Sequence, residues 1–144
     1  MKQIHIDEIR VFNRFYTNII GLLDKYILNS HFTLPEVRIL FELFHNEKMT
    51  SRDIIFTLHI DKGYLSRILK RFEKKKLILK VRSNNDKRST FVKLTQLGIK
   101  EFMILNEAAN NQITEILKQL SLTKCDQLTS NMKSIKKILE EIKG

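Results

Sequence analysis

The chain has 144 residues, of which 42% are hydrophobic, and it contains four glycines and one proline. This composition predicts one globular domain built mainly from helices, because a chain with so few turn residues does not form many strands. The single cysteine excludes a disulfide framework or a cysteine-based zinc site within one chain, and the sequence has no apolar run of 18 residues to predict a transmembrane helix.

The positive charge is concentrated in one part of the chain. Basic residues exceed acidic residues by 10 overall, and residues 61–93 alone carry 12 basic and three acidic side chains, a net charge of +9. A positive field confined to one segment is typical of a protein that binds the phosphates of DNA or RNA. The N-terminus lacks the apolar core of a signal peptide, so we expect a reducing, cytoplasmic location.

A first helix is predicted over about residues 7–29. Its apolar side chains recur at helical spacing, at Ile9, Phe12, Tyr16, Ile19, Leu23 and Tyr26, and further apolar residues widen the stripe. This is more apolar surface than a helix on the surface of one domain needs. We therefore expect part of the helix to contact a second subunit.

Three helix starts follow, each indicated by a capping residue. Thr33 and Glu36 form a capping box before a helix to about residue 46, with Val37, Leu40, Phe41 and Phe44 expected to face inward. Thr50 opens a short helix to Leu58, and Asp61 caps a helix over about residues 62–75, whose expected buried side is Leu65, Ile68, Leu69 and Phe72. Two short helices joined by a tight turn, the second of them basic, indicate a helix-turn-helix.

The hydrophobic period then changes from helical to alternating. Residues 77–81 and 90–94 are rich in β-branched residues and flank a polar segment, which predicts a two-stranded hairpin, or wing. Thr95 is expected to cap a helix over about residues 96–120, and Ser121 a last helix to about residue 142. The fold class expected is thus mainly α with a small β-hairpin wing, a winged helix-turn-helix.

The residues expected to contact DNA come from the basic helix and the wing. One face of the helix is polar and can enter a major groove, where arginine bonds two guanine acceptors at once. An arginine at the wing tip can enter a narrow minor groove. The predicted DNA-binding set is Lys62, Gly63, Tyr64, Ser66, Arg67, Lys70, Arg71, Arg82, Asp86, Lys87 and Arg88.

These segments resemble the MarR family of transcriptional regulators. The resemblance rests on residues 61–75, on the Asp86–Arg88 wing tip, on Leu94-Thr95 followed by Gly98, and on residues 33–40. It implies a single domain over residues 1–144, with dimerisation helices over 7–30 and 96–143 and a winged helix-turn-helix lobe over 33–94. It further implies a homodimer on a pseudo-palindromic operator, and control by a small effector or by oxidation where the lobe meets the dimer region.

Two positions depart from the family pattern. The family commonly has glycine after the recognition helix, where this chain has Lys76, so a left-handed backbone there would cost on the order of 1 kcal/mol. Cys125 lies in the last predicted helix rather than near the N-terminus, which argues against a thiol sensor and favours a buried structural cysteine.

Other functions are less well supported by the residues. The four histidines are scattered without metal-ligand spacing, and no nucleophile elbow or P-loop is present, so we expect no enzyme, no cofactor and no metal. His31 could line an effector pocket or help to bind a metal, although a capping or solvent-exposed role is favoured. The sequence of residues 63–73 is also similar to that of MarR-like domains fused to N-acetyltransferases. Two alternatives to a ligand-responsive repressor therefore stay open: a DNA-binding module of such a system, or an interaction module without an effector.

Overall fold

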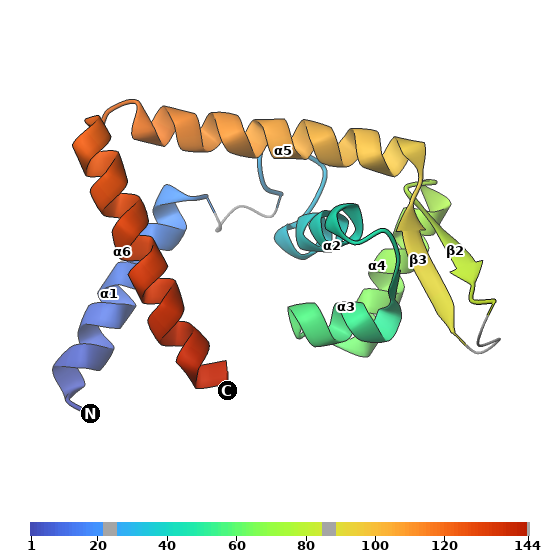
Figure 1. The fold of residues 1–144 in the computed structure, drawn as a ribbon, viewed down its shortest axis with the longest axis horizontal. Helices are drawn as coiled ribbons and strands as arrows, with labels where there is room; N and C mark the ends of the chain where they lie inside the picture. The colour runs from blue at the N-terminus through green and yellow to red at the C-terminus, as the bar shows by residue number, and fades with distance from the viewer. Residues whose placement is uncertain (22–25, 85–88, 144) are drawn as a thin grey trace. The chain divides into compact units, whose positions relative to one another are not determined.

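The computed structural model describes residues 1–21, 26–84 and 89–143, and Figure 1 labels its α-helices and the strands β2 and β3. The elements are α1 (Gln3–Ile19), α2 (Leu34–His45), β1 (Met49–Thr50), α3 (Ser51–Leu58), α4 (Lys62–Lys74), β2 (Ile78–Arg82), β3 (Thr90–Leu94), α5 (Gln96–Leu117), α6 (Leu122–Glu140) and a 3-10 turn (Glu141–Lys143). The predicted fold class, mainly helical with a small wing, is confirmed. The chain divides into two compact units, residues 1–106 and 107–144.

The predicted caps form at the starts of α2 and α3. The backbone N–H and hydroxyl of Thr33 donate to Oε1 of Glu36 at 3.1 and 2.9 Å. Thr50 Oγ1 accepts from the backbone N–H of Asp53 at 3.1 Å, and the Asp53 carboxylate accepts from the backbone N–H of Thr50 at 2.9 Å. These bonds satisfy first-turn amides or fix the cap residue, which is why both helices begin where the sequence predicts.

The core of residues 1–106 lies between the sheet, the three helices of the lobe and the first turns of α5. Helical spacing on α4 and alternation on β3 supply part of this core, as expected from their patterns. Its buried hydrophobic members are Phe32, Ile39, Leu40, Leu43, Met49, Ile54, Leu65, Ile68, Leu69, Phe72, Leu77, Ile78, Val92, Leu94, Phe102 and Leu105. This core packs α3, α4 and the wing strands against one another.

The sheet has a third strand that the sequence did not predict. β3 lies in the middle, with β2 antiparallel on one side and β1 antiparallel on the other. β1 is only two residues long, and Met49 and Thr50 pair with Val92 and Phe91. A strand this short has no hydrophobic period to detect, so the predicted two-stranded hairpin was incomplete. The extra pairing ties the start of α3 to the wing.

The first helix differs from its prediction at both ends. α1 begins at Gln3 and ends at Ile19, whereas the apolar pattern predicted a helix over residues 7–29. Gly21 follows with a left-handed φ of 68°, which ends a helix in the manner of a C-terminal glycine. Leu28 and Asn29 are also left-handed, at 57° and 53°, so the chain turns before α2. Residues 22–25 lie outside the described part of the chain.

Two phenylalanines of α2 do not face the core as predicted. Phe41 and Phe44 are 46% and 41% exposed, while Ile39, Leu40 and Leu43 are buried. The ring of Phe44 stacks on that of Phe102 from α5, with centroids 4.5 Å apart, and Phe41 meets the same ring edge-on at 6.1 Å. The prediction counted every apolar residue as inward, but α2 carries more of them than one face can bury.

Lys76 adopts a left-handed backbone conformation, at the position where the family pattern commonly has glycine. Its φ is 61°, just after the end of α4, and its carbonyl accepts the hydroxyl of Thr95 at 2.6 Å. A side chain in this conformation costs about 1 kcal/mol relative to glycine. The chain tolerates that cost where α4 passes into β2.

Both terminal helices carry apolar side chains that their own unit leaves exposed. No residue of α1 or α6 belongs to the buried class. On α1, Ile9 and Phe15 are 61% and 62% exposed, and on α6, Leu122 and Ile138 are 84% and 63% exposed. In the described parts of the chain, the helices are too short or too polar to cross a lipid bilayer.

Candidate nucleic-acid interface

Helix α4 presents an open polar face along its length. The Asp61 side chain accepts from the backbone N–H of Tyr64 at 2.9 Å, which fixes the first turn. Leu65, Ile68, Leu69 and Phe72 are buried, as predicted from their spacing. The opposite face is exposed at six of the predicted DNA-contact positions, namely Lys62, Gly63, Ser66, Arg67, Lys70 and Arg71.

A groove runs beside this face between α4, the start of α3 and the wing strands. Its volume is about 810 Å³, and its floor is apolar, from Ile55, Leu65 and Leu69. Its walls are polar and carry three cations, with the lining contributed by Thr50, Ser51, Arg52, Lys62, Ser66, Lys80, Ser89 and Thr90. Hydroxyls and cations around an open channel can bind an anionic backbone by charge-assisted hydrogen bonds.

The wing strands direct two cations to the side of the sheet that faces this groove. Ile78, Lys80 and Arg82 occupy every second position of β2, and the register pairs Lys80 with Val92 and Arg82 with Thr90. Because successive side chains on a strand point to opposite faces, Arg82 lies on the same face as the groove-lining Lys80. The predicted wing-tip contacts Asp86, Lys87 and Arg88 lie outside the described residues.

Two predicted contacts do not lie free on the polar face. Tyr64 is half-buried and packs against the core, with the Arg67 guanidinium 5.8 Å from its ring centroid. Arg71 points to the carboxylate of Glu36 on α2, with Nη2 and Oε2 3.6 Å apart. Arg71 is exposed, as its helical position predicts, but that position could not indicate the buried acid on another helix that it faces.

Sequence reasoning missed six polar residues of the groove, namely Thr50, Ser51, Arg52, Lys80, Ser89 and Thr90. Thr50, Ser51 and Arg52 belong to the start of α3, which was treated only as a helix boundary, although free first-turn amides make a helix N-terminus attractive to phosphate. Lys80 was passed over within an apolar strand. Strand alternation would have placed it with Arg82, so the signal for Lys80 was present in the sequence.

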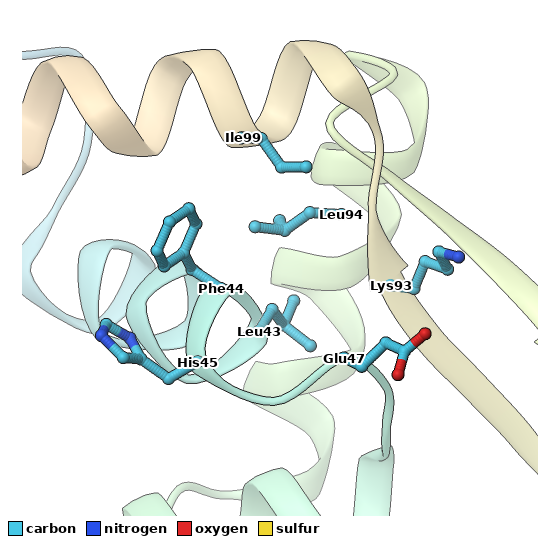
Figure 2. Close-up of a pocket in the computed structure, with 7 residues that line it drawn as sticks. All are labelled: Leu43, Phe44, His45, Glu47, Lys93, Leu94 and Ile99. Atoms are coloured by element: carbon cyan, nitrogen blue, oxygen red, sulfur yellow. The ribbon is translucent and has the colours of Figure 1, made fainter.

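A second, smaller cavity lies on the lobe where α2 ends, β3 ends and α5 begins. It has a volume of about 410 Å³ and is lined by Leu43, Phe44, His45, Glu47, Lys93, Leu94 and Ile99. Figure 2 shows the four apolar side chains gathered in the middle, with Glu47 and Lys93 on one side and His45 on the other. His45 Nδ1 lies 2.9 Å from the Phe41 carbonyl. The cavity thus combines an apolar floor with a charged rim.

Other reactive side chains are dispersed. Within residues 1–21, 26–84 and 89–143, no three histidine, cysteine or acidic side chains are close enough to share a metal ion. His31 is exposed between α1 and α2 and lines neither of the two cavities described above. Cys125 is half-buried rather than fully buried, with its Sγ 4.0 Å from the Leu117 carbonyl.

Comparison with known proteins links this lobe to transcriptional regulators. The sequence model described as the MarR family matches residues 32–90. The chain is 36% identical over 77 residues to the organic hydroperoxide resistance transcriptional regulator of Bacillus subtilis, a match that covers 54% of this chain and 50% of the relative. It is 34% identical over 86 residues to the HTH-type transcriptional regulator MgrA of Staphylococcus aureus, covering 60% and 54%. The matched segment therefore spans about half the length of these relatives.

Solved structures extend the likeness to nearly the whole chain at the level of the fold. The apo form of MarR from E. coli superposes with a TM-score of 0.73 at 23% identity, covering 88% of this chain and 94% of the other. MepR, a transcription regulator of the Staphylococcus aureus multidrug efflux pump MepA, superposes with a TM-score of 0.75 at 21% identity, covering 90% and 96%. The architecture is accordingly that of a MarR-type winged helix.

Proposed function

We propose that this chain, whose residues 32–90 form a winged-helix domain of the MarR family, is a regulator of transcription that binds double-stranded DNA sequence-specifically. Helix α4 enters the major groove, with Arg67 and Ser66 directed at base edges. Lys62 and Lys70 contact phosphates on either side. The wing residues Arg82, Lys87 and Arg88 reach the adjacent minor groove, and Asp86 orients Arg88. Such a protein acts where the chromosome lies, in the cytoplasm.

One observation carries this proposal. Arg52, Lys62 and Lys80 come from α3, α4 and β2, and they line a single groove beside the exposed face of α4. Cations scattered over unrelated faces would not follow a DNA backbone. Their convergence next to a polar helix supports phosphate contacts that set the register, with base contacts from α4 to supply specificity.

We further propose that the functional species is a homodimer. The apolar side chains of α1 and α6 that remain exposed in the single chain support this, because faces of this kind are normally covered. Two copies related by a two-fold axis would present two α4 helices about 34–36 Å apart, one turn of DNA. The operator is then pseudo-palindromic, and repression by excluding polymerase is the expected outcome.

Selection of bound duplexes from a random pool tests both proposals. We expect a palindromic site to be enriched, with its half-sites about one helical turn apart, and a gel shift to favour that duplex over duplex RNA of the same sequence. Enrichment of a single half-site would contradict the dimer. Equal binding of every duplex, or a preference for RNA, would contradict sequence-specific DNA recognition.

The cavity of Figure 2 supports regulation by a small molecule. Its volume of about 410 Å³ lies in the range of small-ligand sites. The apolar floor and Lys93 suit an aromatic molecule that carries one acidic group. Because Lys93 belongs to β3 and Ile99 to α5, a bound ligand would contact both the wing and the helix that leads to the dimer region. A change in the separation of the two lobes would then release the DNA.

Aromatic acids the size of benzoate provide a direct test of that cavity. A bound acid should raise the midpoint of thermal unfolding in a concentration-dependent way, since it stabilises the folded state. The shift should disappear in Phe44→Ala, which removes an apolar wall, and persist in Arg38→Ala, a change elsewhere on α2. The effector proposal fails for this cavity if the two variants respond alike.

The chain could instead be the DNA-binding module of a system with an N-acetyltransferase domain. This alternative rests only on the sequence of residues 63–73. Oxidation as the signal is a weaker alternative, although one relative is named for organic hydroperoxide resistance. The thiol of Cys125 is half-buried in the second unit, and Cys125 is not among the residues that line the groove or the cavity.

A further inference from the structure

Glu36 has an environment unlike that of the other charged residues. Within the described residues, it is the one charged side chain in the buried class, at 5% exposure. Its Oε1 accepts two hydrogen bonds from Thr33, as part of the cap of α2. Its Oε2 faces Arg71 Nη2 of α4 at 3.6 Å. A buried carboxylate is costly unless it is paired, so the cation from α4 stabilises Glu36 where it lies.

The contact between Glu36 and Arg71 belongs to a larger junction. Phe32, just before α2, meets Phe72 of α4 edge-on with ring centroids 6.2 Å apart. Lys75 Nζ lies 5.9 Å from the centroid of the Phe32 ring. The segment that leads into α2 is thus held against the last turns of α4 by an aromatic pair, a cation over a ring and an ion pair. Of these contacts, only the ion pair involves a residue on the polar side of α4, namely Arg71.

The position of Arg71 gives this junction a consequence for DNA reading. Arg71 lies one helical turn after Arg67, so the two side chains leave α4 on nearly the same side. Any rotation of α4 about its axis that broke the contact between Arg71 and Glu36 would turn Arg67 by the same angle. Bidentate bonding to guanine tolerates little misorientation, because both hydrogen bonds require aligned atoms.

We propose that Arg71 is a positioning residue, which fixes the rotation of α4 through Glu36 and so aims Arg67, and that it makes no phosphate contact. This inference rests on the proposed function, DNA binding through α4. It replaces the sequence-based assignment of Arg71 to the DNA-contact set. Half of the Arg71 side chain, 49%, is exposed, so a phosphate contact is the competing outcome that the experiment must separate.

The test compares Arg71→Gln, Glu36→Gln and Lys70→Gln in the full chain on the selected duplex and on a duplex with one altered base pair. Glu36→Gln keeps an oxygen to accept from Thr33 but removes the charge. A positioning role predicts that Arg71→Gln and Glu36→Gln each lower the discrimination between the duplexes about three- to tenfold and that the double variant is no worse than either. The dependence of affinity on salt should stay unchanged in both, because no phosphate contact is lost. Arg71→Lys, which keeps the charge, should restore part of the discrimination.

Lys70→Gln is the contrasting variant, since it should reduce the salt slope by about one and leave discrimination intact. The proposal is overturned if Arg71→Gln behaves like Lys70→Gln while Glu36→Gln has no effect. A double-mutant cycle on the free energy of unfolding, without DNA, tests the pair by itself, and absence of coupling there also overturns the proposal. If the unmodified chain binds no duplex at all, the proposed function fails, and the unfolding cycle still decides whether Glu36 and Arg71 are coupled.

Discussion

Replacing Arg67 by alanine is expected to weaken binding of the selected duplex by about 1–3 kcal/mol and to relax base preference at one position of each half-site. Arg67 is exposed near the middle of α4, with its guanidinium 5.8 Å from the ring of Tyr64, which restricts its directions. Loss of a bidentate contact leaves the guanine acceptors without their partner. Binding titrations against the selected duplex and its single-base variants measure both effects.

Arg38→Ala is the matched control for this change, because Arg38 is an exposed arginine of the same lobe on a different helix. It should leave both affinity and base preference within error of the unmodified chain. If Arg67→Ala instead weakens binding equally on every duplex, Arg67 contacts a phosphate and another residue of α4 reads the base.

Replacing Gly98 by alanine is expected to destabilise the fold by about 1–3 kcal/mol, as overpacking of a core does. Gly98 lies in the first turn of α5, and a Cβ there would meet the Leu77 carbonyl oxygen at 2.1 Å and the Leu94 side chain at 3.1 Å. That oxygen already accepts from the backbone N–H of Thr95 at 3.0 Å, so it cannot move away without loss of a bond. The clash outweighs the gain of about 0.5–1 kcal/mol that alanine gives a helix.

Gly63→Ala provides the comparison, because it makes the same chemical change in the first turn of another helix. A Cβ at residue 63 would lie 3.3 Å from Asp61 Oδ2, which a shift of a few tenths of an ångström in that side chain relieves, and 3.7 Å from the Arg67 side chain. The helix propensity of alanine should therefore show as a small gain or no change in stability. Urea unfolding of the two variants measures the difference, and equal midpoints would contradict the close approach of α5 to Leu77.

Local features of the fold were predictable because their causes are local. The capping pairs at Thr33 and Thr50 and the cap at Asp61 place helix starts within a residue of those observed. The runs rich in β-branched residues at 77–81 and 90–94 predict the wing strands, which the structure has at residues 78–82 and 90–94. By contrast, α1 ends at Ile19 despite an apolar pattern that runs further, because a left-handed Gly21 stops the helix. β1 has no pattern of its own and exists only through its pairing with β3.

The candidate site divides in the same way. Helical spacing alone identified Lys62, Ser66, Arg67 and Lys70 as an outward set, since exposure on a helix follows from its own period. The same rule placed Arg71 in this exposed set but could not indicate its partner Glu36, which lies in another helix. It also left out Arg52 and Lys80, which line the groove only because α3 and β2 pack beside α4.

The sequence by itself determined the two wing strands, where the helices from α2 to α6 begin, and that the positive charge falls after residue 60. Capping, periodicity and charge act between near neighbours. The tertiary structure alone decided which cations line one groove, which arginine faces a buried acid, and which phenylalanines remain at the surface. Those outcomes depend on contacts between residues far apart in the chain, and no local pattern records such contacts.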